Sequence, residues 1–367
     1  MPEQPTLIDI YSGAGGVTQG FKNHNFKILA AIEYDQTIAY TYKTNHPEVM
    51  MYDRDIKSIH PKEVLKDCGL KRGELTVLSV CAPCQPFSRQ TRLTREDNRT
   101  KLVLEMIRFV AVLRPQFAIM ENVPGLGKGK NKSILDKLIN VLRDKLRYKV
   151  HEPVVVDAVN YGVPQFRKRL ILLCSREDID LDVPTETHAS PNTAEKLGKI
   201  PWQTVGDAFV DIHSLAAGQT SRTDPMHKAR LHTTINMERL RHIPKNGGSR
   251  HDLPEHLVLA CHKKKNTGYN DVYGRLDSKR PANTLTTGCT NLTKGRFAHP
   301  TANRAITPRE AAKLQTFPKD YVFQGSYDQI SAQIGNAVPV NFAEVFAKYF
   351  YSLWQDSLTD SHFDPTR

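Results

Sequence analysis

The sequence lacks a long apolar segment and contains few cysteines. No part of the 367 residues approaches about 18 consecutive apolar residues, so we expect no membrane-spanning helix. The first residues show no basic region followed by an apolar core, so no secretory signal is expected either. Six cysteines are too few to hold a chain of this length together by disulfides. These absences favour reduced thiols and a cytoplasmic protein.

Acidic residues are in deficit. Asp and Glu number 39 against 51 Lys and Arg, which gives a formal net charge of +12. Half of this excess falls between residues 222 and 265, where ten basic residues stand against four acidic ones. A basic surface predicts a polyanionic partner, with nucleic acid favoured over an acidic membrane surface. The alternative is that the charge serves only to keep the protein in solution.

Residues 1–175 alternate short apolar runs with amphipathic segments. Strands are expected at 7–10, 26–32, 75–79 and 117–120, and helices at 37–43, 102–113 and 134–146. This alternation predicts an α/β fold with a mainly parallel sheet and helices on both faces. Two further runs, 154–156 and 170–173, have no long helix between them and predict an antiparallel pair at the sheet edge.

The pattern changes after residue 175. Between 176 and 290 the periodicity fades, and Pro, Gly, His and basic residues become frequent, which predicts a second, smaller and loop-rich domain. Nearer the C-terminus, Thr307, Pro308 and Glu310 form a capping-box pattern that should begin a helix. A last helix is expected from about residue 340 to residue 354.

The first candidate binding site is a strand that runs into a glycine-rich turn and then a helix. The turn contains three glycines that let a ligand approach the backbone closely: Gly13, Gly15 and Gly16. Their spacing is not that of the dinucleotide motif. Glu33, at the end of the next expected strand, suits the hydroxyls of a ribose. Tyr34 could stack on a purine, and Asp55 could accept a hydrogen bond from an adenine amino group. The combination favours an adenosine-containing ligand, whereas the turn alone could be purely structural.

The segment Cys81-Ala-Pro-Cys84 follows the strand expected at 75–79. A zinc site would need a second pair of ligands at similar spacing, and the other cysteines offer none. A redox pair normally begins a helix, but Pro83 and Pro86 keep this segment extended. The sequence therefore favours a single nucleophile, Cys84, on a loop at the carboxyl end of a strand, with Cys81 as a packed small residue. No metal is expected.

Two further segments carry charged candidates. Glu121 follows the apolar run 117–120, where partial exclusion of solvent would favour proton donation; the alternative is an ordinary surface glutamate. Arg167 and Arg169 lead into the run 170–173, and on a strand they would point to the same face. Two guanidinium groups on one face can hold a carboxylate, a phosphate or a base oxygen, unless they form only a solvated basic patch.

In this order, the motifs resemble those of the C5-cytosine DNA methyltransferases. The resemblance rests on Tyr-Ser-Gly-Ala-Gly-Gly at 11–16, Pro-Cys-Gln-Pro-Phe-Ser at 83–88, Glu-Asn-Val at 121–123 and Gln-x-Arg-x-Arg at 165–169. Three later segments agree, namely Arg-Pro-Ala-Asn-Thr-Leu-Thr-Thr at 280–287, Leu-Gln-Thr-Phe-Pro at 314–318 and Gln-Ile-Gly-Asn-Ala-Val-Pro at 333–339. The match spans nearly the whole chain, although Tyr11 stands where the family usually has Phe and Phe166 lies inside the Gln-x-Arg-x-Arg block.

This resemblance implies a mixed, mainly parallel, seven-stranded Rossmann-like methyltransferase sheet. Residues 1–175 and 291–367 would form the catalytic domain, and residues 176–290 the target-recognition domain. The implied cofactor is S-adenosylmethionine. Its pocket would consist of Tyr11, Gly13, Gly15 and Gly16 at the methionine end, Glu33 at the ribose, Asp55 and Ile56 at the adenine, with Tyr34, Pro83, Leu102 and Asn336 completing it.

The resemblance also implies the reaction. Cys84 would add to C6 of a flipped-out cytosine, so that C5 can attack the methyl group. Glu121 would hydrogen-bond to N3 or protonate it, Arg169 would contact O2, and Arg167 would support the site. The basic segment 88–101 would close over the base as a mobile loop; the alternative is an ordinary basic loop.

The implied partner is double-stranded DNA, bound by a monomer in a bacterial cytoplasm. The expected setting includes a cognate restriction endonuclease acting on the same sequence; the alternative is an orphan methyltransferase without one. A tRNA cytosine-5 methyltransferase is an alternative, but that subgroup usually carries Cys-Phe-Thr, which is absent here. An amino-methyltransferase would need an Asp/Asn-Pro-Pro-aromatic motif, which is also absent. A non-enzymatic DNA-binding relative should have lost the nucleophile or the acid, and this chain has both Cys84 and Glu121.

Overall fold

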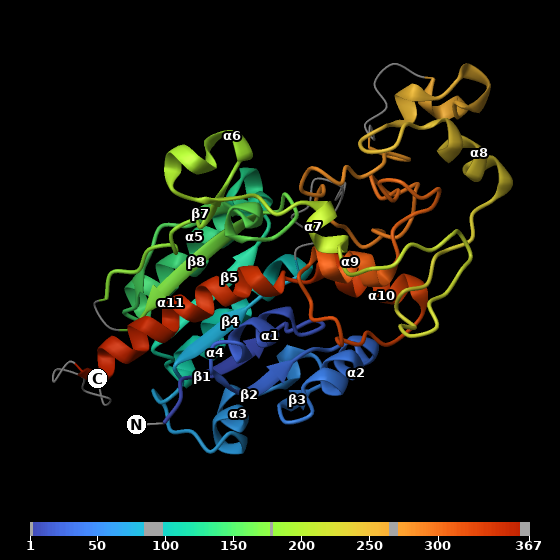
Figure 1. Cartoon of the computed structure of the whole chain (residues 1–367). Helices are drawn as coiled ribbons and strands as arrows, with labels where there is room; N and C mark the ends of the chain where they lie inside the picture. Colours follow the sequence, from blue (N-terminus) through green and yellow to red (C-terminus); the bar gives the residue numbers. More distant parts are fainter. Residues whose placement is uncertain (1–2, 84–97, 177–178, 264–270, 360–367) are drawn as a thin grey trace. The chain divides into compact units, whose positions relative to one another are not determined.

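The computed structural model describes residues 3–83, 98–176, 179–263 and 271–359. Within them the chain forms two compact units (Figure 1). The first unit comprises residues 1–157, 168–185 and 340–367, and the second comprises residues 158–167 and 186–339. These boundaries differ from those expected for the catalytic and target-recognition domains: residues 158–167 and 291–339 fall in the second unit, and residues 176–185 fall in the first.

The first unit is built on one mixed sheet. Its strands are β1 (Thr6–Ile10), β2 (Lys27–Ile32), β3 (Met50–Tyr52), β4 (Val77–Val80), β5 (Phe117–Asn122), β6 (Lys149–Val150), β7 (Val154–Asp157) and β8 (Lys168–Ser175). They lie in the order β3-β2-β1-β4-β5-β8, and β6 and β7 pair one after the other along the free edge of β8. The first five strands are parallel, and β6, β7 and β8 add the antiparallel part. The expected seven-position sheet and its antiparallel edge are confirmed.

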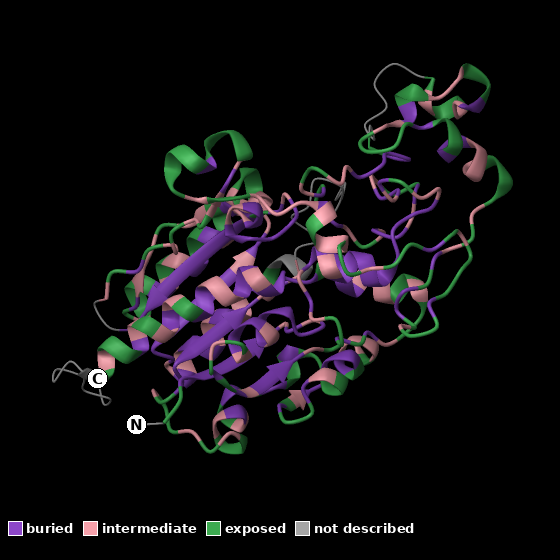
Figure 2. Cartoon of the chain, in the orientation of Figure 1, coloured by how far each residue is buried: buried purple, intermediate pink, exposed green. Residues whose placement is uncertain are grey.

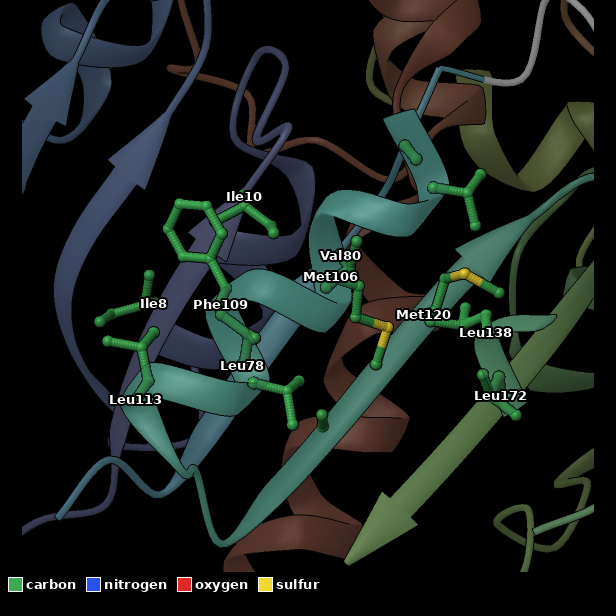
Figure 3. Packing of buried hydrophobic residues seen from close by; sticks show 14 of the residues in the cluster. Ile8, Ile10, Leu78, Val80, Met106, Phe109, Leu113, Met120, Leu138 and Leu172 are labelled. Atoms are coloured by element: carbon green, nitrogen blue, oxygen red, sulfur yellow. The ribbon is translucent and has the colours of Figure 1, made fainter. Parts of the chain in front are cut away.

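Helices cover both faces of this sheet. They are α1 (Gly16–Lys22), α2 (Gln36–Asn45), α3 (Pro61–Asp67), α4 (Glu105–Leu113), α5 (Lys132–Asn140), continued by a π-helical turn at Val141–Lys145, and α11 (Val340–Thr359). Alternate residues along the strands point to opposite faces. Figure 3 shows Ile8, Leu78, Met120 and Leu172 of the strands packed with residues of α4 and α5, such as Phe109 and Leu138.

The opposite face of the sheet packs against α1 and α11. The ring of Phe117 on β5 lies 5.3 Å from that of Phe350 on α11. Val77 and Leu173 are likewise fully buried, so the central strands are mainly apolar on both faces, with buried polar exceptions such as Asp9 and Ser79. Figure 2 shows the same pattern, with buried strands enclosed by helices that are exposed on their outer side. The sheet therefore holds the carboxyl ends of β1, β2, β4 and β5 at a common edge, where the expected site residues follow.

The second unit consists mainly of loops joined by short elements. These are β9 (His188–Ala189), α6 (Pro191–Ala194), β10 (Ile200–Pro201), α7 (Val205–Phe209), α8 (Thr234–His242), α9 (Pro308–Leu314) and α10 (Tyr327–Asn336). The capping box expected at the start of α9 is confirmed: the Glu310 amide donates to Thr307 Oγ1, and the Thr307 amide donates to the Glu310 carboxylate at 2.8 Å. In the described part of the chain, no helix is long and apolar enough to span a membrane.

Candidate active site

The glycine turn follows directly after β1. Its backbone is left-handed at Tyr11, Gly13 and Gly15, with φ of 60°, 55° and 94°, and helix α1 then begins at Gly16. Glycine is the residue that adopts this conformation without strain, which explains the two glycines there. A Cβ placed on Gly13 would meet none of the described residues within 4 Å, so this side of the turn borders open space among them. The turn is thus both conformationally fixed and accessible to a ligand.

Glu33 lies beside the glycine turn, as the sequence predicts. It follows β2, whose neighbour in the sheet is β1, and its two carboxylate oxygens accept hydrogen bonds from the Gly13 amide at 3.2 Å and the Asp35 amide at 2.9 Å. Burial raises the pKa of the Glu33 carboxyl above its usual value, although these amide donors partly oppose the shift. The carboxylate is therefore held in one orientation at the rim of the turn, where it suits the two hydroxyls of a ribose.

Other expected pocket residues lie in the same unit as Glu33 and the glycine turn. The Tyr11 hydroxyl donates to the Leu102 carbonyl oxygen at 2.8 Å, which joins two of them. Tyr34 is 68% exposed. Asp55 begins a short 3-10 helix, where its Oδ1 accepts the Lys57 amide at 2.9 Å, and Ile56 is buried behind it. The exposed Tyr34 ring is available for stacking. One of the two Asp55 carboxylate oxygens already accepts a hydrogen bond within the local turn.

The ends of β4 and β5 meet at the same edge. The Asn122 side-chain amide donates to the carbonyl oxygen of Ala82 at 3.0 Å, which fixes the segment Cys81–Pro83 against the end of β5. Burial raises the pKa of the Cys81 thiol well above its usual value, and the nearby carboxyl groups of Glu121 and Asp9 add to the shift. Cys81 therefore stays protonated and packed. The expected nucleophile, Cys84, and most of the expected loop at 88–101 lie outside the described residues.

Glu121 and Arg169 form a largely buried ion pair. The distance from Arg169 Nε to Glu121 Oε1 is 2.5 Å, and the two side chains are only 9% and 14% exposed, respectively. They are brought together by the antiparallel pairing of β5 with β8, in which Glu121 lies opposite Ile171. Removing one member of such a pair leaves an uncompensated charge and typically costs about 3–5 kcal/mol. The surface-glutamate alternative is thereby wrong, because Glu121 lies at the strand end with its side chain largely buried and paired with Arg169.

Arg167 has a different environment from Arg169. Strand β8 begins at Lys168, and the Arg167 guanidinium donates to the carbonyl oxygens of Leu285 at 3.1 Å, Gly335 at 3.1 Å and Ala337 at 2.9 Å. The two arginines therefore do not both lie on the strand, because β8 begins one residue after Arg167, and the Arg167 guanidinium is bound by carbonyl groups of the second unit.

Asn336 lies in the same unit as Arg167. Its side chain is exposed at the end of α10, between the two residues whose carbonyl oxygens Arg167 binds. Arg167 thus fixes the backbone on both sides of Asn336, which gives it a supporting role for the segment 335–337.

Asp9 is a residue of interest that the sequence reasoning did not single out. It is fully buried on β1, its Oδ2 accepts the Thr18 hydroxyl at 3.1 Å, and Thr18 Oγ1 lies 2.7 Å from the Tyr42 hydroxyl oxygen. Burial raises the pKa of Asp9 to about 7, against the lowering effect of the Ser79 and Thr18 hydroxyls. An aspartate inside an apolar strand, directly before a glycine turn, is the signal that could have identified it.

The described residues contain no group of three or more His, Cys, Asp or Glu side chains that could hold a metal ion. What the first unit does provide is a glycine turn with a fixed carboxylate, next to a buried acid–arginine pair at the same sheet edge. This arrangement can bind a ribose-bearing ligand and stabilise a polar ring close to it.

Comparison with known proteins agrees with this arrangement. Residues 6–352 match the family described as C-5 cytosine-specific DNA methylase. The chain is 34% identical over 348 residues to the type II methylase M.HgiDII of Herpetosiphon aurantiacus, covering 93% of this chain and 94% of that protein. It is 34% identical over 349 residues to the type II methyltransferase M.PspPI of a Psychrobacter species, covering 94% of this chain and 78% of that protein.

Solved structures share the fold. A prophage-encoded protein from E. coli superimposes with a TM-score of 0.74 at 24% identity, covering 96% of this chain and 99% of that one. The Entamoeba histolytica methyltransferase EhMeth gives a TM-score of 0.64 at 14% identity, covering 98% of this chain and all of that one. The family match extends over most of the chain and over all the strands of the main sheet. The chain therefore belongs to the C-5 cytosine-specific DNA methylases.

Proposed function

We propose that this protein transfers a methyl group from S-adenosylmethionine to C5 of a flipped-out cytosine in a short double-stranded DNA sequence. The observation that carries the proposal is the buried Glu121–Arg169 pair beside the Cys81–Pro83 segment, at the sheet edge that also holds the glycine turn and Glu33. A ring-binding pair and a ribose-binding carboxylate at one edge are what methyl transfer to a nucleobase needs.

The cofactor supplies an electrophilic methyl group on a sulfonium sulfur. The glycine turn would receive its methionine end, because the backbone at Gly13 borders open space. Glu33 would accept hydrogen bonds from its ribose hydroxyls with oxygens that the Gly13 and Asp35 amides already orient. The fixed carboxylate lowers the ordering cost of binding.

The chain's own residues would activate the cytosine. C5 of cytosine is a poor nucleophile. Formation of a bond between the Cys84 sulfur and C6 would move electron density to C5. C5 would then bond to the methyl carbon as the bond from that carbon to the sulfonium sulfur breaks, which leaves S-adenosylhomocysteine. Glu121 would hydrogen-bond to N3 or protonate it, while Arg169 would hold Glu121 and contact O2. Loss of the C5 proton to a base and cleavage of the bond from sulfur to C6 would then restore the ring and the thiolate.

Residues 176–290 would read the target sequence. Exposed basic residues there, including Arg241, Lys245 and Lys263, can contact phosphates, and other side chains would read base edges in the major groove. The similarity to type II methyltransferases supports a role in a restriction–modification system, in which methylation protects host DNA from an endonuclease with the same target. We propose that the protein acts as a monomer.

The test is base-resolution mapping of 5-methylcytosine in plasmid DNA from cells that express the wild type or Cys84→Ser. We expect one short sequence to be methylated with the wild type only. Methylation by Cys84→Ser at the wild-type rate would contradict the mechanism. In parallel, DNA and RNA that contain 5-fluorocytosine should be incubated with the protein, because the fluorine blocks the final elimination. A covalent adduct with RNA but not with DNA would contradict the proposed substrate.

A further inference from the structure

A run of exposed cations lies on the first unit, outside the residues proposed to read the target. It comprises Lys128, Lys130, Lys132, Lys137, Lys145 and Arg147, which we call the basic ridge. All six side chains are exposed, and none has an ion-pair partner among the described residues. Two exposed acids accompany them, Asp136 and Asp144, and the latter pairs with Arg143. The ridge therefore carries an uncompensated positive charge.

The beginning of the ridge is anchored close to the Glu121–Arg169 pair. Leu126 is fully buried, and a Cβ on Gly127 would lie 2.9 Å from Leu170 Cδ1, so the chain packs tightly against the residue next to Arg169. The Asn131 side-chain amide donates to the Gly125 carbonyl oxygen at 3.2 Å, and the Ser133 hydroxyl donates to that of Lys130 at 2.9 Å. The first three lysines of the ridge thus lie on an ordered segment near the candidate active site.

The three lysines at the beginning of the ridge do not serve the stability of the fold. Lys128, Lys130 and Lys132 stand at the N-terminal end of α5, where positive charge opposes the helix dipole, and the first turn of α5 contains no acidic residue. Like charges close together also repel one another. A surface that is unfavourable in the free protein points to a polyanionic partner that neutralises it.

We propose that the basic ridge binds the phosphate backbone of duplex DNA that flanks the target, independently of its sequence; this rests on the proposed function. The helix from Lys132 to Lys145 is about 20 Å long, which corresponds to about six base pairs of duplex. The contact would add affinity and hold the duplex while the target base is turned out of the stack.

The test measures the salt dependence of binding to a duplex of about 40 base pairs of random sequence, with the full-length protein. In the variant Lys128→Gln/Lys130→Gln/Lys132→Gln, the slope of log affinity against log salt should fall by up to about 2.7, or about 0.9 per lost contact. The control is Lys62→Gln/Lys66→Gln/Lys71→Gln, which removes the same charge from exposed sites in the same unit. Its slope should equal that of the wild type.

Three outcomes would overturn the basic ridge as a DNA surface. The first is an unchanged slope in the ridge variant, the second an equal fall in both variants, and the third a loss of binding to single-stranded RNA without a loss for duplex DNA. Covalent trapping on saturating fluorocytosine DNA at low salt separates the two proposals. If the wild type is not trapped, the proposed function fails. If the wild type and the ridge variant are trapped equally but their slopes match, only the ridge proposal fails.

Discussion

At the scale of single residues, the most specific prediction concerns the effect of Glu33 on the affinity for the cofactor product. Glu33→Gln removes the charge that would accept the ribose hydroxyls, and hydrogen bonds to charged groups contribute about 1.5–3 kcal/mol. Affinity for S-adenosylhomocysteine, measured by calorimetry, should fall by about 10- to 100-fold. Glu48→Gln, which alters an exposed carboxylate paired with Lys22, should bind as the wild type does. Equal affinity in both variants would remove Glu33 from the pocket.

Glu121 should affect both the chemical step and the stability of the fold. Glu121→Gln keeps the size of the side chain and an oxygen that can accept from Arg169, but it is a poor proton donor. General acid catalysis contributes about 10²- to 10⁴-fold, so single-turnover methylation should slow by that factor. The thermal midpoint should also fall, because Arg169 keeps its buried charge without a carboxylate partner. A wild-type rate would show that proton donation by Glu121 is not needed.

Asp9 should make stability depend on pH. Its pKa is raised from 3.8 to about 7 in the folded protein, so folding favours the protonated carboxyl. The stability that Asp9 contributes is therefore present below about pH 4 and is lost as the pH rises through about 7. Asp9→Asn cannot ionise, so from pH 4 to pH 8 it should gain stability relative to the wild type, by up to about 4 kcal/mol. Parallel denaturation curves at several pH values check this, and a constant difference would contradict it.

At the scale of elements, the contact between α1 and α11 depends on a glycine. A Cβ on Gly20 would lie 2.7 Å from Ala343 Cβ and 2.8 Å from the Val340 carbonyl oxygen, closer than atoms can approach. Gly20→Ala should therefore cost about 1–3 kcal/mol despite the higher helix propensity of alanine. Gln19→Ala, one position along the same helix, should change stability by less than about 0.5 kcal/mol. Urea denaturation of the two variants compares them, and a stable Gly20→Ala would mean that the helices can move apart.

At the scale of the whole molecule, each of the two units has different stabilising interactions in its interior. The first has a continuous apolar core around its sheet. The second is mostly loops, and its buried Arg275 donates to the carbonyl oxygens of Leu240 at 2.6 Å, Ile243 at 3.1 Å and Ala302 at 2.7 Å. Burial lowers the pKa of Arg275, although the carbonyl groups keep its donors satisfied. The Arg275 guanidinium thus supplies hydrogen-bond donors to carbonyl groups that a helix or a sheet would pair with backbone amides.

Removal of Arg275 should therefore loosen one unit selectively. Arg275→Met would leave several buried carbonyl groups unpaired, each at a cost of about 1–3 kcal/mol. Hydrogen exchange should become faster in α8 and in the surrounding loops, whereas the amides of β1, β4 and β5 should keep their protection. Arg241→Met, on the exposed side of α8, is the control and should leave both patterns unchanged. Uniform loss of protection would mean that the units unfold as one.

Much of the first unit could be predicted from the sequence. Apolar runs of strand length correctly predicted β1, β2, β4 and β5, and amphipathic segments correctly predicted α2 and α5. The short β3 and α3 were missed, because three residues and seven residues carry too little periodicity to be distinguished from a loop. The division of the chain also depends on contacts far apart in sequence, so residues 291–339 joined the second unit unexpectedly.

The sequence by itself determined the α/β class, the glycine turn, the order of the motifs and the residues Glu33, Glu121 and Arg169, because local patterns and residue chemistry are written in it directly. Tertiary structure alone decided which of them meet. The register of β5 against β8 joins Glu121 to Arg169, and the neighbouring positions of β1 and β2 bring Glu33 to Gly13. It also gave Arg167 a set of carbonyl partners more than a hundred residues away. Such partnerships depend on the packing of distant segments, which no local pattern contains.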